Sequence, residues 1–213
     1  NRGAYCQLEE GFTLSLAREV SSWLEAQGGF ETRVSRDAGE RIDYHQRVEE
    51  AEAWGADVFV SLHSDVRGVG APWTPRPGGP ACPRSQDAPG FSVLWSDASP
   101  AAATNQRLGR ALAEQMTLTG LPAYDGRHYG AVYDLDRETP GLFVDRHPPG
   151  ERIFVLWRPH FPAVLIETHH ALDDREVRRW SMPETQRAFA SALAAALREA
   201  LPPQRQARAP QRP

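Results

Sequence analysis

Apolar residues recur every three or four positions in four segments of the chain. This is the spacing of the buried face of an amphipathic helix. Glycine or proline stands at several of the boundaries, where helices commonly begin or end. The predicted helices cover residues 10–27, 42–54, 99–119 and 181–201. Ser181 and Glu184 have capping-box spacing, which predicts the start of the last helix.

Shorter apolar runs, rich in β-branched and aromatic residues, lie between these helices and are typical of buried strands. The predicted strands cover residues 30–34, 57–63, 91–95, 152–156 and 163–167. Strands that alternate with amphipathic helices predict an α/β fold. We expect a three-layer sandwich, with a mostly parallel twisted sheet of about six strands flanked by helices.

Two stretches, 66–90 and 120–151, lack a regular pattern and are rich in glycine, proline and charged residues. Loops of this length are either functional or tolerated surface insertions. Residues 202–213 offer almost nothing to bury, and we expect a disordered tail there. The sequence therefore predicts a single domain over 1–201.

Composition narrows the function. The chain of 213 residues is 40% hydrophobic and 24% charged, with a formal net charge of −4. A dedicated nucleic-acid-binding protein needs a basic face, which this balance does not favour. No apolar run is long enough to span a bilayer. We therefore expect neither a nucleic-acid partner nor a membrane span.

The chain has two cysteines, Cys6 and Cys82, both in sequence typical of loops. No CxxC pair is present, which argues against a zinc site built from thiolates. The two residues could form one disulfide in an oxidising compartment, or they could be unrelated free thiols.

Polar residues with catalytic chemistry follow two of the predicted strands. Glu167 ends the run PAVLIE, and His63 ends DVFVSLH. Glu9 lies just before the first helix. At the carboxyl ends of parallel strands these side chains would meet in one crevice. Imidazole and carboxylate can bind a catalytic zinc ion, and another carboxylate can act as general base. Taken singly, His63 could be structural and Glu9 could interact with the helix dipole.

Four segments resemble the zinc-dependent N-acetylmuramoyl-L-alanine amidases, which are cell-wall hydrolases. They are EEGFTLSLA at 9–17, RVSRD at 33–37, RVEEAEAWGADVFVSLHSD at 47–65 and FPAVLIET at 161–168. The resemblance implies that Glu9 and His63 bind Zn²⁺ and that Glu167 is the catalytic glutamate. It also implies an earlier histidine ligand, on a first strand that would lie upstream of Asn1.

The same resemblance implies the substrate and the setting. The bond cleaved would join N-acetylmuramic acid to L-alanine in peptidoglycan, and the enzyme would be periplasmic or extracellular in a bacterium. A regulatory partner is not identified by the sequence.

Three further residues could assist at the site. His169, which departs from the family pattern, could donate to an oxyanion or line a polar pocket. Asp65 could orient His63 or stabilise a turn. Arg158 could contact a substrate carboxylate or an oxyanion. Three aromatic residues are candidates for stacking on sugar or peptide: Trp73, Tyr124 and Tyr129.

Two other functions remain open at this point. The altered Glu-Thr-His-His segment and the long loops fit another zinc amidohydrolase or peptidase, acting on a small N-acyl or peptide substrate. The lack of a matched first ligand fits a non-catalytic wall-binding domain.

Overall fold

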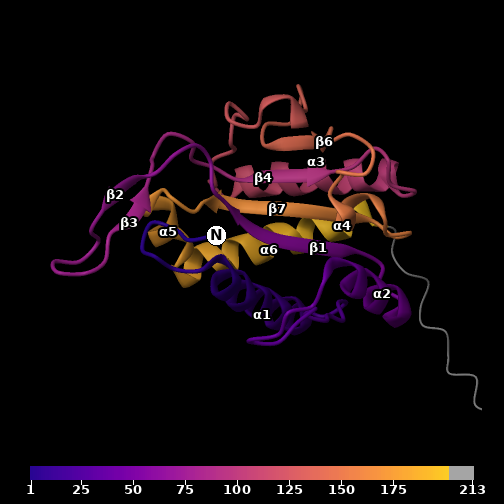
Figure 1. Cartoon of the computed structure of the whole chain (residues 1–213). Coiled ribbons are helices and arrows are strands. Elements are labelled where there is room, and N and C mark those ends of the chain that lie inside the picture. Colours follow the sequence, from indigo (N-terminus) through magenta and orange to yellow (C-terminus); the bar gives the residue numbers. More distant parts are fainter. Residues whose placement is uncertain (202–213) are drawn as a thin grey trace, which may run out of the picture.

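The computed structural model describes residues 1–201, so the predicted disorder of 202–213 lies outside the described residues. Figure 1 shows a sheet flanked by helices. The helices are α1 (Glu9–Gln27), α2 (Tyr44–Trp54), α3 (Ala102–Leu118), α4 (Phe154–Trp157), α5 (Asp174–Trp180), α6 (Pro183–Ala200) and the 3-10 turn η1 (Gly130–Val132). The strands are β1 (Phe59–Asp65), β2 (Ala71–Trp73), β3 (Cys82–Arg84), β4 (Ser92–Trp95), β5 (Tyr133–Leu135), β6 (Leu142–Asp145) and β7 (Ala163–His170).

The central sheet has five strands in the order β1-β7-β4-β6-β5. β1 runs parallel to β7, and β4 runs parallel to β6, but β4 is antiparallel to β7 and β5 is antiparallel to β6. The α/β prediction is therefore right, whereas the mostly parallel sheet of about six strands is wrong. The sheet is mixed because the chain returns in the opposite direction between β1 and β4.

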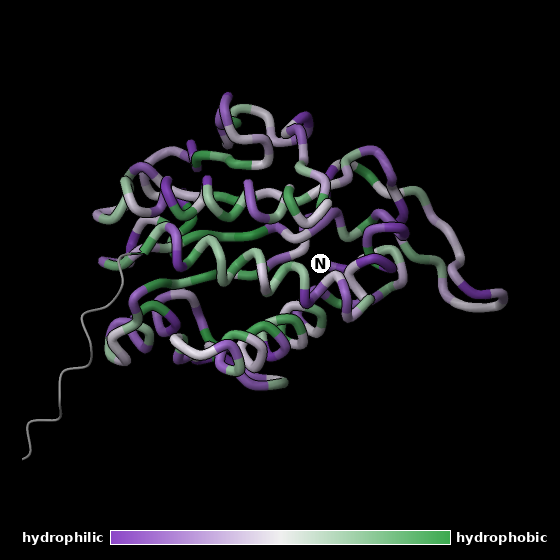
Figure 2. Tube along the Cα trace, turned by 180° about the vertical axis from the view of Figure 1, so that it is seen from behind, coloured by the Kyte–Doolittle hydropathy of each residue, from purple (hydrophilic) through white to green (hydrophobic). Residues whose placement is uncertain are grey.

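The two faces of the sheet are covered differently. On one face Val93, Val164 and Ile166 pack against the three long helices α1, α3 and α6 in the larger core cluster. On the other face Leu94 and Leu165 pack against Tyr124 and other side chains from the loops and α4. In Figure 2 the strands and the inner sides of these helices are hydrophobic. The thinner, loop-covered face is the one on which the candidate site lies.

Two strand predictions are wrong. Residues 30–34 form no strand, because a cavity separates them from the edge of β1 and leaves no ladder partner beside them. The run 152–156 contributes to helix α4, in which Val155 and Leu156 are buried. There the Ile153 amide donates to Asp145 Oδ2 at 2.9 Å.

Several elements lie where the sequence predicted irregular structure. β6 and β5 lie within 120–151, and β6 is fully buried in the sheet. The hairpin β2–β3 lies within 66–90. Helix α5 was also not predicted. The Ser181 capping box is wrong, since Ser181 Oγ donates back to Arg178 O and ends α5 while Met182 precedes α6 without a side-chain cap.

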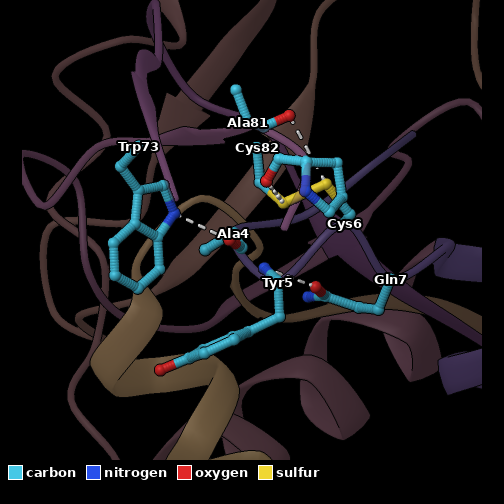
Figure 3. Close-up of a disulfide and its surroundings, with 8 residues drawn as sticks. Ala4, Tyr5, Cys6, Gln7, Trp73, Ala81 and Cys82 are labelled. Atoms are coloured by element: carbon cyan, nitrogen blue, oxygen red, sulfur yellow. Dashed lines mark hydrogen bonds between the residues drawn. A yellow bond between two sulfur atoms is a disulfide. The ribbon is translucent and has the colours of Figure 1, made fainter. Parts of the chain in front are cut away.

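The β2–β3 hairpin projects from one end of the molecule and is fastened to the segment that precedes α1 (Figures 1 and 3). Cys6 and Cys82 form a disulfide, which settles the two alternatives for the cysteines. The Trp73 indole N–H also donates to Ala4 O at 2.7 Å. Helix α1 begins three residues after Cys6, so these contacts fix the chain that leads into Glu9.

Among residues 1–201, no helix is both long and apolar enough to cross a membrane.

Candidate functional site

Three polar side chains form a row across adjacent strands of the sheet. His63 on β1 pairs in register with Glu167 on β7, and Glu167 pairs with Ser92 on β4. Paired residues point to the same face, with Cβ atoms about 5 Å apart. Their chain neighbours Leu62, Ile166 and Val93 pack on the long-helix side. The row therefore lies on the loop-covered face, as expected for His63 and Glu167.

Glu9 lies next to His63, at the β1 end of this row. It is the first residue of α1, and its Oε1 forms a hydrogen bond with His63 Nδ1 at 3.0 Å and accepts from the Ser64 amide at 3.2 Å. Burial raises the pKa of the Glu9 carboxyl, but the hydrogen bonds and the charge of His63 outweigh it, so the pKa lies below its usual value. Glu9 is therefore a carboxylate at neutral pH.

Glu167 is the acid with the most perturbed environment in the site. Burial raises its pKa well above the usual value, the carboxylates of Asp65 and Glu9 raise it further, and Arg67 lowers it. Its Oε2 atom is buried and has no hydrogen-bond partner among the described residues. A buried carboxyl oxygen without a partner is costly, and is typical of a group that acts on a ligand.

A cavity of about 760 Å³ opens beside the Glu9–His63 pair. It lies between α1, residues 30–42 and the outer edge of β1, and Asn1 lies at its rim. The Asn1 side chain donates to Ser64 O at 2.8 Å, and its amino group is 3.5 Å from Glu9 Oε2. Apolar side chains line its inner part: Leu14, Val20, Leu24, Val60, Leu62, Leu193 and Leu197.

The donor atoms of Glu9 and His63 fit part of a zinc site. Two ligands of one tetrahedral zinc ion lie about 3.3 Å apart, close to the 3.0 Å between Glu9 Oε1 and His63 Nδ1. Among residues 1–201, however, no group of three or more His, Cys, Asp or Glu side chains could hold a metal ion. A catalytic zinc ion has three protein ligands, so the described residues do not complete such a site by themselves.

Arg67 is a site residue that the sequence analysis missed. Its side chain is only 2% exposed, and its Nε donates to Asp65 Oδ2 at 2.9 Å. Its guanidinium also donates to Ala88 O, Gly90 O and Ser92 Oγ and lies 3.9 Å from the centre of the Tyr124 ring. No sequence motif marks Arg67, so only the fold reveals that it belongs to the site.

Asp65 and Arg158 do not have the expected contacts. Both ring nitrogens of His63 bond elsewhere, to Glu9 and to Ser61 Oγ, whereas Asp65 accepts from Arg67. Arg158 follows α4, before the amino end of β7, and its nearest carboxylate is Glu52 at 3.7 Å. The length of β7 thus separates Arg158 from the site.

His169 is packed away from the row because β7 contains one extra residue. The register changes from His63–Glu167 to Asp65–His170, which is two residues on β1 against three on β7. His169 stacks on Trp180 and meets Phe12 edge-on. Burial, helped by the charge of Arg67, lowers its pKa to about 3. It is a neutral core histidine in this structure.

The three aromatic candidates for stacking are all engaged within the protein. Tyr124 is 1% exposed and lies under Arg67. The Tyr129 hydroxyl is 2.7 Å from Asp65 Oδ2 and 2.9 Å from Ser92 Oγ. Trp73 packs against Tyr5 and Arg84 in the hairpin.

Comparison with known proteins identifies the family. A family profile described as N-acetylmuramoyl-L-alanine amidase matches residues 1–199. The chain belongs to the N-acetylmuramoyl-L-alanine amidase family. It is therefore an enzyme of the peptidoglycan hydrolase class, as the resemblance in sequence predicted. No curated protein matches the chain in a direct sequence search.

Solved structures of amidases share the fold. Ami1 from Mycobacterium smegmatis superposes with a TM-score of 0.68 at 19% identity, covering 92% of this chain and 78% of that one. AmiC2 of Nostoc punctiforme gives a TM-score of 0.63 at 22% identity, covering 92% and 86%. The catalytic domain of CwlV from Bacillus (Paenibacillus) polymyxa gives 0.65 at 20%, covering 92% and 87%. At these identities the likeness establishes the amidase fold.

Proposed function

We propose that this amidase hydrolyses the bond between N-acetylmuramic acid and L-alanine in peptidoglycan with zinc as cofactor and Glu167 as general base. The observation that carries the proposal is the unpartnered Oε2 of Glu167, held in register beside His63, which in turn contacts Glu9. A rigid central strand positions it, and its raised pKa suits a group that takes up and returns a proton.

Glu9 and His63 would provide two of the zinc ligands. The third donor has to come from outside the described residues, and we propose a histidine in the polypeptide that precedes Asn1. Two features support this: Asn1 lies within hydrogen-bond reach of β1, and the cavity beside it has the apolar lining of a space for a strand. When bound, zinc would act as a Lewis acid that polarises the amide carbonyl and makes water more acidic.

The chain's own residues would move the proton. Glu167 Oε2 would accept a proton from the attacking water as the new C–O bond forms at the amide carbonyl. The same oxygen would return this proton to the nitrogen of L-alanine as the C–N bond breaks. The buried position of Oε2 limits its access to bulk water, so the proton stays available for the leaving amine.

A periplasmic or extracellular location is part of the proposal. The enzyme has to reach the cell wall, and the Cys6–Cys82 disulfide is of the kind that persists in oxidising compartments.

The test uses the chain with about thirty native residues added before Asn1, the length of a strand and a turn with some margin. Zinc content and release of stem peptide from purified peptidoglycan are measured for this protein and for Glu167→Ala. We expect one zinc per chain in both, and release lowered by about 10²- to 10⁴-fold in the variant.

Each other result has a definite meaning. If the protein binds zinc and hydrolyses a small N-acyl amino acid but releases no peptide from peptidoglycan, the substrate is a small soluble molecule and not peptidoglycan. Absence of zinc in the extended chain would overturn the assignment of zinc as the cofactor. Full release by Glu167→Ala would overturn the assigned base.

A further inference from the structure

Arg67 reaches across the strand that carries Glu167. It follows β1 by two residues, yet its guanidinium donates to Ser92 on β4 and to the carbonyls of Ala88 and Gly90 just before β4. In the sheet β7 lies between β1 and β4. The Arg67 side chain must therefore pass over β7, on the face on which Glu167 and Ser92 lie side by side.

The crossing is fixed at both ends. At the β1 end, Arg67 Nε donates to Asp65, and the Arg67 amide donates to His170 Nδ1 on β7 at 3.2 Å. At the β4 end, the Tyr129 hydroxyl bridges the Asp65 and Ser92 oxygens. A planar guanidinium with four side-chain hydrogen bonds has little freedom to move.

The positive charge of Arg67 acts on Glu167 through space, from the same face of β7. Arg67 stabilises the charged form of the Glu167 carboxyl, and Glu167 in turn favours the charged form of Arg67. Glu167 therefore has different neighbours on the two adjacent strands. Towards β4 it faces Ser92, with Arg67 and Tyr129 bonded to that serine, and towards β1 it faces His63 and Glu9.

We propose that Arg67 is a positioning residue: it fixes a positive charge beside Glu167, on the face of β7 that carries this side chain, and this charge biases the orientation from which the Glu167 carboxylate acts on water near His63. The proposal rests on the function assigned to Glu167 above. Arg67 touches neither substrate nor cofactor in this account. It acts through its charge on the Glu167 carboxylate, without a hydrogen bond to it among the described residues.

The test compares Arg67→Met, which removes the charge, with Arg67→Lys, which keeps the charge but not the fork of hydrogen bonds. Both are made in the upstream-extended chain, and kcat, KM, zinc content and thermal unfolding are measured. We expect kcat to fall about 10²-fold in Arg67→Met and about 10-fold in Arg67→Lys, because small misplacements of a catalytic group have effects of this size. KM and zinc content should stay within about two-fold of the parent.

Arg84→Met is the matched control. Arg84 also donates Nε to a carboxylate, Asp174 Oδ1 at 2.7 Å, and lies 4.8 Å from an aromatic ring centre, that of Trp73. Its loss should lower the unfolding temperature but leave kcat unchanged. If Arg67→Lys and Arg67→Met lose kcat equally, in proportion to their unfolding temperatures, Arg67 is merely structural and the proposal is overturned.

Ser92→Ala covers the case in which neither Arg67 variant folds. It removes one acceptor of the guanidinium with a minimal change in volume, and we expect kcat to fall about 10-fold with KM unchanged, the effect of one hydrogen bond to a charged group. An unchanged kcat would overturn the proposal. Glu167→Ala is measured alongside: if it keeps full activity, the base assignment fails, whereas an inactive Glu167→Ala with fully active Arg67 variants defeats only the role of Arg67.

Discussion

At the scale of residues, the neighbours of each buried group determine which groups carry charge in and near the site. Glu9 is held as a carboxylate and Glu167 has a raised pKa. His169 is held neutral, although it lies only two positions after Glu167 on β7. The difference arises from neighbours: Glu9 has hydrogen-bond donors, Glu167 has one buried oxygen without any, and His169 has aromatic rings. Residue type alone would not separate these roles.

His169 gives a stability prediction. Its pKa is about 3 in the folded chain and about 6.5 when unfolded. As the pH falls below about 6.5, the unfolded chain binds a proton that the folded chain does not, so folding is disfavoured progressively towards pH 3. Between pH 7 and pH 5 this histidine should lower the free energy of unfolding by about 2 kcal/mol.

The measurement is urea unfolding at pH 7 and pH 5 for the parent and for His169→Gln. The loss on acidification should be smaller in the variant by about 2 kcal/mol. Glu167 and Glu176, whose pKa values are raised, act in the opposite direction but cancel in the comparison. Equal losses in the two proteins would show that His169 is protonated in the folded state.

At the scale of elements, the hairpin β2–β3 and the segment before α1 act as one unit. The disulfide links positions 76 residues apart, so it restricts the unfolded chain strongly. The entropy of closing a loop of this size corresponds to about 4 kcal/mol. The unit also sets where α1 begins, and hence where Glu9 lies.

Reduction of the disulfide should therefore lower the free energy of unfolding by about 4 kcal/mol. The measurement is chemical unfolding with and without a thiol reductant, and the control is the double variant Cys6→Ala/Cys82→Ala, which should not respond to the reductant. A parent that unfolds identically in both conditions would contradict a stabilising role.

The long elements were predictable and the short ones were not. Helices α1 and α6 have an extended apolar stripe, and β7 has a run of apolar residues, so local pattern decides each of them. β6 is only four residues long and lies among glycine and proline, so its place depends on pairing with β4. The run 152–156 has the composition of a strand, but its residues contribute to helix α4, which buries Val155 and Leu156.

The candidate site was predictable to the same extent. His63 and Glu167 follow runs whose pattern is clear, and the fold brings them into register. Arg67 was missed because its importance comes from contacts 21 to 25 residues away in sequence. The packing of His169 away from the site could not be predicted, because one extra residue in β7 breaks the alternation, which no sequence pattern signals.

At the scale of the whole molecule, the sheet is unequally protected. β7 is paired on both sides, whereas β1 is an edge strand that borders the cavity. Strands with fewer buried contacts open at lower free energy. Backbone amides of β1 should therefore exchange hydrogen at least tenfold faster than those of β7 in peptide-resolved exchange. Equal protection of the two strands would contradict this, and in the upstream-extended chain the difference should shrink.

The position of β7 has a consequence for synthesis. It lies between β1 and β4 in the sheet, yet Ala163 comes 98 positions after Asp65 in the chain, and β1 has no other ladder partner among the described strands. While a ribosome adds the residues between Asp65 and Ala163, the β1 segment must wait without its neighbour. Nascent chains that stop before Ala163 should thus be digested readily by protease, and resistance should appear only once β7 has emerged from the ribosome.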